Sequence, residues 1–169
     1  MVAMVGAPAL AQDQPGAFGP RQGDYELTIS GGGNNDRNFD AGQFNTNFEL
    51  GHYLTSDLSV AVRQDVSWIN GADTPDSWNA ATRAVAQYHF DMGQFRPFIG
   101  ANVGFKYGED IRDTGTAGPE AGVKWYVKDE TFIYGRVGFD IEFRNFREID
   151  EDRRRSGTWV YAVGVGFNF

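Results

Sequence analysis

Bulky apolar residues alternate with small or polar residues along almost the whole chain. Residues 157–169 show the pattern most clearly, since every second position is bulky and apolar: Trp159, Tyr161, Val163, Val165, Phe167 and Phe169. An alternation of period two is typical of β-strands whose two faces meet different surroundings, and no segment shows a helical period. The pattern predicts an all-β protein with eight strands, at residues 24–32, 43–55, 58–70, 77–91, 95–108, 117–128, 131–145 and 158–169.

The connections between these strands alternate in length. Tight turns are predicted at residues 55–57, 92–94 and 128–130, and longer polar loops at residues 34–42, 71–76, 109–116 and 146–157. Short turns at one end and long loops at the other are typical of an eight-stranded antiparallel up-and-down transmembrane β-barrel. Because the number of strands is even, we expect both termini at the short-turn end, which faces the periplasm in such barrels.

The charges on the less apolar face of the strands distinguish a membrane barrel from a soluble β-protein. In segment 131–145, Ile133 and Val137 share one face, whereas Arg136 and Asp140 share the other. The alternative, an antiparallel sandwich with a solvated polar face, gives no reason for charges that nearly cancel. A narrow closed interior does, because unpaired buried charges are costly. We therefore expect a lumenal charge network of Glu26, Glu49, Arg63, Asp65, Arg83, Arg96, Lys106, Glu120, Lys124, Arg136, Asp140, Glu142 and Arg144.

Aromatic residues gather at two levels of the apolar face. Such bands are typical of the two headgroup interfaces of a bilayer, where amphipathic rings are favoured. We expect a girdle at the short-turn end that includes Tyr25, Leu54, Tyr88, Phe90, Trp125 and Phe167. At the long-loop end we expect a second girdle of Trp68, Trp78, Tyr107, Phe143 and Trp159.

Composition narrows the possible functions. A chain of 169 residues is expected to form one domain. The mean hydropathy of −0.45 would alone indicate a soluble protein, but strands with one apolar face give a weak hydropathy signal. A net charge of −8 argues against a nucleic-acid partner. The chain has no cysteine, which excludes disulfides, thiol nucleophiles and thiolate metal sites.

The N-terminal residues suggest export from the cytoplasm. A short apolar stretch ends on Ala9, Leu10 and Ala11, which form an A-x-A cleavage pattern, and polar Gln12 follows. We expect residues 1–11 to be the remnant of a signal peptide, residues 12–23 a flexible leader and residues 24–169 the barrel domain. A disordered apolar N-terminus is the alternative.

Residues 24–169 resemble the small eight-stranded outer-membrane β-barrel proteins of Gram-negative bacteria, the OmpA/OmpX-like or opacity-like "porin family" group. Three stretches carry the resemblance: YHFDMGQFRPFIGANVGF at 88–105, GPEAGVKWYVKDE at 118–130, and the terminal VGVGFNF. The resemblance implies location in the cell outer membrane. It also implies that the C-terminal strand, ending on the aromatic Phe169, is the signal read by the barrel-assembly machinery. It does not imply the larger OmpA architecture, since no peptidoglycan-binding domain is expected after Phe169.

Some barrels of this kind modify lipid A, an activity that requires catalytic residues. A hydrolase would need a serine, a histidine and a carboxylate placed together. His52 and His89 are the two histidines, and neither lies in the His-x-Ser pattern of the lipid A deacylases. A calcium-loop spacing that starts at Asp36 has Ala41 and Asn47 where glycine and glutamate are needed. We expect no catalytic residue, cofactor or metal.

These observations predict a non-enzymatic barrel that displays surface loops and serves envelope integrity, surface interaction or adhesion. A lipid A-modifying enzyme and a small-solute channel remain open as alternatives, although eight strands leave an interior that side chains can fill. We expect outer-membrane lipid as a partner, and lipopolysaccharide at the charged loop 148–155. A homodimer through strand four is a further hypothesis, because its outward residues are small: Ala80, Thr82, Ala84 and Ala86.

Overall fold

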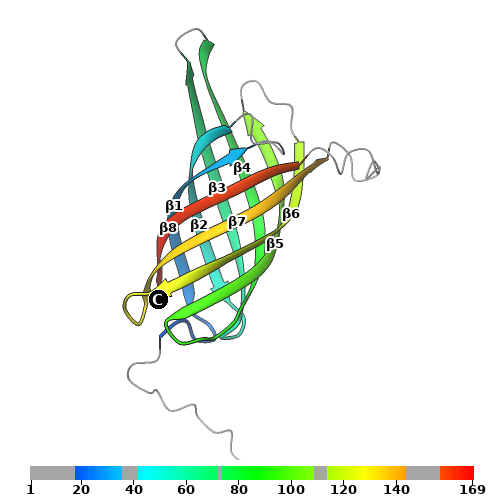
Figure 1. Ribbon diagram of the computed structural model, residues 1–169. Coiled ribbons are helices and arrows are strands. Elements are labelled where there is room, and N and C mark those ends of the chain that lie inside the picture. Colours follow the sequence, from blue (N-terminus) through cyan, green and yellow to red (C-terminus); the bar gives the residue numbers. More distant parts are fainter. Residues whose placement is uncertain (1–17, 36–41, 72–73, 109–113, 144–156) are drawn as a thin grey trace, which may run out of the picture.

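Eight antiparallel strands form one closed barrel in the computed structural model, which describes residues 18–35, 42–71, 74–108, 114–143 and 157–169 (Figure 1). For residues 35, 42–44, 68–71 and 74–77 it describes the backbone alone. Within these ranges no helix is long and apolar enough to cross a membrane. The strands are β1 (Tyr25–Asn35), β2 (Gly42–Tyr53), β3 (Leu58–Gly71), β4 (Thr74–His89), β5 (Phe95–Gly108), β6 (Thr114–Tyr126), β7 (Thr131–Phe143) and β8 (Gly157–Asn168). The predicted fold class is confirmed.

The first and last strands close the barrel. β1 pairs with β8 in a register that runs from Glu26 opposite Asn168 to Asn35 opposite Trp159. Tyr25 and Phe169 extend this ladder, because each backbone N–H donates to the carbonyl oxygen of the other, at 2.8 and 2.9 Å. Closure leaves no free strand edge, so the backbone hydrogen bonds are satisfied within the sheet.

The strand limits lie close to the predicted ones, with one clear difference. Residues 71–76 were expected to form a long loop, but β3 runs to Gly71, β4 begins at Thr74, and these two residues pair. The β3–β4 hairpin therefore extends above the other strands (Figure 1). Cross-strand hydrogen bonds satisfy the backbone there without an apolar face, so hydrophobic alternation could not mark where the strands end.

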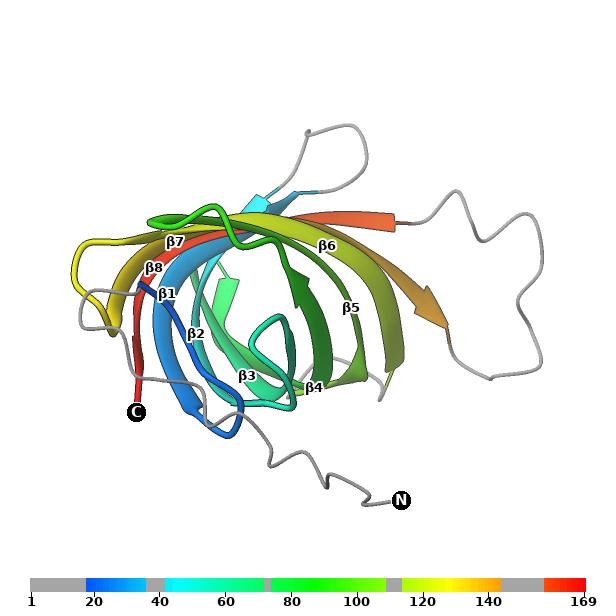
Figure 2. The ribbon, with the colours of Figure 1, turned by 90° about the horizontal axis from the view of Figure 1, so that it is seen from below.

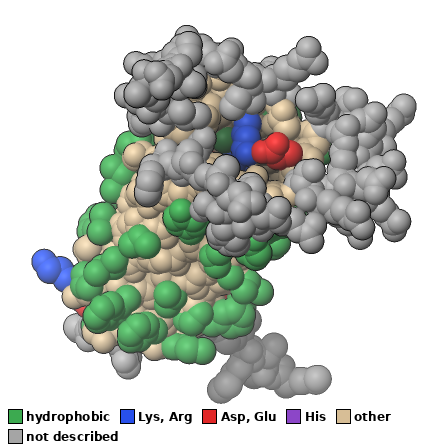
Figure 3. All heavy atoms as spheres, turned by 45° about the horizontal axis from the view of Figure 1, so that its top comes forward, with side chains coloured by type: hydrophobic (Ala, Val, Ile, Leu, Met, Phe, Trp, Pro, Cys, Tyr) green, Lys and Arg blue, Asp and Glu red, His purple; other side chains and the backbone are tan. Residues whose placement is uncertain are grey.

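The two faces of the wall are inverted relative to a soluble protein. On β7, Ile133 and Val137 are 41% and 47% exposed, whereas Arg136 and Asp140 are 7% and 1% exposed. Hydrophobic side chains are distributed over the visible outer wall, with backbone and uncharged side chains between them (Figure 3). A continuous apolar exterior is unfavourable in water and favourable in hydrocarbon.

Aromatic rings fill the lower, short-turn end of the lumen. Tyr53, Phe98, Tyr126, Phe132 and Tyr134 are all buried there. The inward position of these rings was not predicted. Phe132 and Tyr134 alternate with the outward residues of β7 and therefore lie on the same face as Arg136.

Lumen-facing glycines make room for these rings as well as for basic side chains. A Cβ atom on Gly104 would lie 2.2 Å from the carbonyl oxygen of Thr82 and 2.8 Å from Cγ of Arg83, so Gly104 leaves room for this long basic side chain. A Cβ atom on Gly166 would instead lie 2.2 Å from Cζ of Phe132, and one on Gly122 would lie 2.5 Å from Cζ of Phe98.

Replacement of Gly166 by alanine is expected to destabilise the barrel. The added methyl group would overlap the buried Phe132 ring, and such overpacking costs about 1–3 kcal/mol. Gly135→Ala is the matched control, because a Cβ atom there meets nothing within 4 Å. The free energies of unfolding of both variants are measured by urea unfolding in lipid vesicles, with tryptophan fluorescence as the readout. Equal midpoints for the two variants would contradict the assigned packing.

Candidate functional site

The middle of the lumen contains a layer of buried ion pairs. Arg63 on β3 contacts Glu49 on β2, with 2.5 Å between Nε and Oε2. Its two terminal nitrogens donate to both oxygens of Glu120 on β6, at 2.8 and 2.9 Å. Arg136 on β7 adds a longer contact of 3.4 Å to Glu120. The bidentate contact joins strands that are not neighbours in the sheet, so it spans the lumen.

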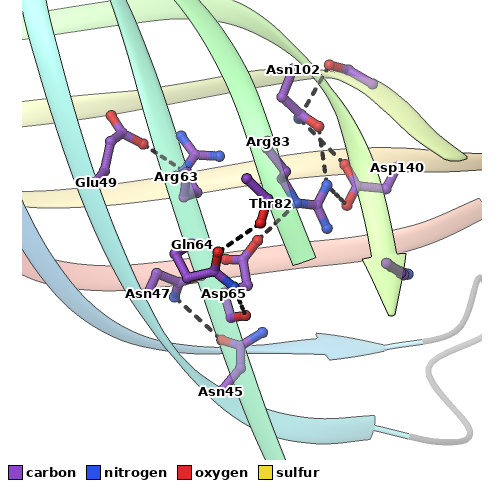
Figure 4. A network of polar contacts seen from close by, with 12 residues as sticks. Asn45, Asn47, Glu49, Arg63, Gln64, Asp65, Thr82, Arg83, Asn102 and Asp140 are labelled. Atoms are coloured by element: carbon purple, nitrogen blue, oxygen red, sulfur yellow. Dashed lines mark hydrogen bonds and ion pairs between the residues drawn. The ribbon is translucent and has the colours of Figure 1, made fainter. Parts of the chain in front are cut away.

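Arg83 on β4 forms the second half of this layer (Figure 4). Its Nε lies 2.8 Å from Oδ2 of Asp65, and its Nη1 lies 2.5 Å from Oδ2 of Asp140. The same Nη1 donates to Oδ1 of Asn102 at 3.0 Å. Arg83 stands directly opposite Arg63 in the β3–β4 register, a repulsive arrangement for two like charges. The carboxylates on both sides offset this repulsion.

A second ionic cluster lies below this layer, among the lumenal aromatic rings. Nζ of Lys124 donates to both oxygens of Glu26, at 2.6 and 2.7 Å, and to the hydroxyl of Tyr53 at 3.0 Å. It also lies 5.0 Å from the ring centre of Phe132, within cation–π range. Lys124 is 2% exposed, and these contacts replace the water that its ammonium group loses.

The outermost pairs are more accessible. At the lower mouth, Arg96 contacts Asp91 at 2.9 Å, and the Asp91 side chain is 57% exposed. Toward the upper end Lys106 pairs with Glu142, whose side chain is 42% exposed. Basic and acidic side chains are visible inside the upper opening (Figure 3).

All the predicted lumenal charges in the described part of the chain form ion pairs. Arg144 lies outside the described residues. Asp91 was not predicted as part of the network, although the strand predicted at residues 77–91 ends on it and it shares the inward parity of Arg83; the observed β4 ends two residues earlier, at His89.

Little space remains inside the ionic layer. A cavity of about 10 Å³ lies among Arg63, Asp65, Arg83, Glu120 and Arg136. Such a space holds about one water molecule. A larger hollow of about 670 Å³ lies on the outer wall, where Ile99, Val137 and Phe139 line it. The described lumen is closed in its middle.

The predicted girdle residues lie on the outer wall where their side chains are described. Tyr25, Tyr88, Phe90, Trp125 and Phe167 are 41–48% exposed near the short-turn end. Trp78 and Trp159 are exposed near the opposite end, and Tyr107 and Phe143 are partly exposed. The side chain of Trp68 lies outside the described part. Phe95 was missed; its ring stacks on Trp125 with centres 5.6 Å apart.

His89 is buried in the lumen beside a serine. Its Nε2 lies 3.1 Å from Oγ of Ser59 and 3.5 Å from the hydroxyl of Tyr53. Among the described residues, Nδ1 of His89 has no hydrogen-bond partner. The pair therefore lacks the carboxylate that orients the imidazole in a hydrolase triad.

Two further features bear on ligands and partners. No cluster of three acidic or histidine side chains able to hold a metal occurs in the described ranges.

On β4, Thr82, Ala84 and Ala86 are exposed on the outer wall, as expected, but Ala80 is only 6% exposed. Thr82 Oγ1 donates to Oε1 of Gln64 at 2.7 Å. The loop at residues 148–155 lies outside the described residues, as does most of the segment that begins at Asp36.

A closed antiparallel barrel with an apolar exterior, aromatic residues at both ends and paired ions inside is an outer-membrane β-barrel. The sequence model of the OprF membrane domain family matches residues 1–169, and the chain belongs to this family.

Known proteins similar to this chain agree with this class. Outer membrane porin F of Pseudomonas fluorescens is 26% identical over 143 residues, which cover 75% of this chain and 40% of the relative. The chain thus spans about 40% of the length of this curated relative. The N-terminal β-barrel domain of Pseudomonas aeruginosa OprF has a similar fold, with a TM-score of 0.62, 20% identity, and coverage of 88% of this chain and 98% of that one. For Neisserial surface protein A, the TM-score is 0.67, the identity 18% and the coverages 88% and 98%.

Neutralisation of Glu120 is expected to destabilise the barrel strongly. Glu120→Gln leaves Arg63 with fewer acceptors in a buried site, and loss of one partner of a buried pair costs about 3–5 kcal/mol. Glu142→Gln is the matched control, because its pair is partly exposed and such pairs contribute about 0–1 kcal/mol. Equilibrium urea unfolding in vesicles measures both values. Similar losses in the two variants would contradict the importance of the ionic layer.

Proposed function

We propose that this chain is a non-enzymatic integral outer-membrane barrel whose role is to display surface loops for envelope integrity, surface interaction or adhesion. The single observation that carries the proposal is the lumen filled by paired ions. A lumen closed by ion pairs such as Arg63–Glu120 and Arg83–Asp140 has little space for a ligand, which favours a role for the loops. The Ser59–His89 pair supports no catalytic role, because it is buried and lacks an orienting carboxylate.

The proposed orientation has both termini in the periplasm. The short connections at residues 54–57, 90–94 and 127–130 lie at the same end of the barrel as Tyr25 and Phe169. Periplasmic turns are short in outer-membrane barrels, and extracellular loops are longer. The connection at residues 144–156 would then face the cell exterior.

A small-solute channel is the second candidate function. One relative bears the name "Outer membrane porin F", and the lumenal layer is polar throughout its middle. Conduction would require Arg63, Arg83 and their carboxylates to rearrange, because the space among them is about 10 Å³.

The proposed partners follow from the surfaces. The apolar wall and its girdles would contact outer-membrane lipid, and loop 148–155, with its arginines and carboxylates, would contact lipopolysaccharide. The C-terminal strand ending on Phe169 would be recognised by the barrel-assembly machinery. A homodimer through Thr82, Ala84 and Ala86 remains a proposal; Ala80 contributes little exposed surface to it.

An epitope inserted after Glu151 is expected to bind antibody on intact Gram-negative cells, because this connection would face the exterior. The matched control carries the same epitope after exposed Gly93 in the β4–β5 turn, and it should bind only after the outer membrane is permeabilised. Flow cytometry measures both. Antibody binding by the Gly93 insertion on intact cells would contradict the orientation and the display of loops.

Planar-bilayer recordings are expected to show no steady large openings, because ion pairs fill the middle of the barrel. Protein-free detergent is the control for spontaneous events. Steady openings of large conductance would favour the channel over a closed barrel that displays loops.

A further inference from the structure

The last residues of the predicted leader lie across the lower mouth of the barrel. Residues 12–17 are outside the described part, but residues 18–23, here called the N-terminal strap, are attached at two separate points. The N–H of Gly19 donates to the carbonyl of Asp129 in the β6–β7 turn at 3.0 Å, and that of Gly23 donates to the carbonyl of Tyr53 at 2.9 Å. Seen from below, the strap crosses the side of this mouth next to β1 and β2 before it joins β1 (Figure 2).

Phe18 enters the mouth itself. It packs against the buried cluster of Tyr126, Phe132 and Tyr134, whose side chains face the lumen. Phe18 is partly buried by this contact, and Pro20 is buried. An untethered polar leader would bury neither residue, so the strap has a defined seat on the lumenal aromatic cluster.

Arg96 holds the strap from the barrel side. Its Nη2 donates to the carbonyl oxygen of Phe18 at 2.9 Å. Gly19 lies against the same guanidinium group, because a Cβ atom there would be 2.3 Å from Nε of Arg96. The φ angle of Gly19 is +98°, a conformation that residues with an L side chain rarely adopt. Phe18 therefore fits through its aromatic contact and its hydrogen-bonded carbonyl, and Gly19 fits because it has no side chain to collide with Arg96.

We propose that the N-terminal strap is a removable seal on the periplasmic mouth, separate from the ionic layer in the middle of the lumen. The strap is held by a few hydrogen bonds and one aromatic contact at the solvent-facing end, whereas each barrel strand is paired along its length on both sides. Segments with few contacts open at a lower free energy than the fold that carries them. The seal therefore opens while the barrel stays closed. This inference does not depend on what the surface loops bind.

Thiol labelling tests the seal directly, because the chain has no cysteine of its own. Ser59→Cys places one thiol in the lower lumen, where Ser59 is 4% exposed and lies beside His89. The probe is a charged methanethiosulfonate added to the folded barrel in detergent micelles. In this background Phe18→Ala should raise the labelling rate by about tenfold, because it removes the contact of Phe18 with the buried aromatic cluster. Gln22→Ala, an exposed position of the same strap, should leave the rate unchanged.

A second pair of variants tests the seat at Arg96. Gly19→Ala and Gly93→Ala both place a side chain at a positive φ, +98° and +75°, but only the first meets other atoms within 4 Å. Gly19→Ala should label as fast as Phe18→Ala, and Gly93→Ala should label like the parent. Phe18 and Gly19 lie outside the strands, and a heat-modifiability gel verifies that each variant is a folded barrel.

The seal is overturned if the parent Ser59→Cys protein already labels as fast as the Phe18→Ala variant. It is also overturned if Phe18→Ala and Gly19→Ala label no faster than Gln22→Ala and Gly93→Ala. Faster labelling confined to Phe18→Ala and Gly19→Ala supports it.

Discussion

The structure depends on the pairing of opposite charges across a lumen from which water is largely excluded. Arg63 on β3 reaches Glu120 on β6, Arg83 on β4 reaches Asp140 on β7, and Lys124 on β6 reaches Glu26 on β1. Each contact joins strands that the sheet does not pair directly. A buried charge without its partner is costly. These contacts therefore favour a barrel narrow enough for side chains from opposite walls to meet.

This pairing also explains the exterior. Once the charged side chains point inward, the alternating positions of each strand must point outward, and those positions carry Ile133, Val137, Val163 and similar residues. Closure of β1 on β8 removes the last free strand edge, so neither side chains nor backbone present unpaired polar groups to hydrocarbon. Lumen and wall are thus two consequences of one alternation. Both proposals made for this protein, the display of surface loops and the N-terminal strap, therefore concern the ends of the barrel.

Much of this fold could be predicted from the sequence because strand parity is a local property. β5 was predicted at residues 95–108 and is observed as Phe95–Gly108. The inward face of β7 was likewise predicted correctly from the alternating positions of Arg136 and Asp140. The partners of the charges could not be predicted: Glu49 stands opposite Arg63 in the register of neighbouring strands, but parity does not identify Glu120, which is 57 residues away across the lumen. Phe18 was missed because it lies outside the strands, where period two carries no information. Asp91 was missed although the strand predicted at residues 77–91 included it.

The most direct test is a nitroxide scan of β7 in lipid bilayers, with one label at a time and accessibility to molecular oxygen as the readout. Oxygen concentrates in hydrocarbon, so the label reports whether each position faces lipid. The account predicts high accessibility at Ile133, Gly135, Val137 and Phe139 and low accessibility at Tyr134, Arg136 and Gly138. Uniform accessibility along the strand, or alternation in the opposite phase, would contradict the inward placement of the charges.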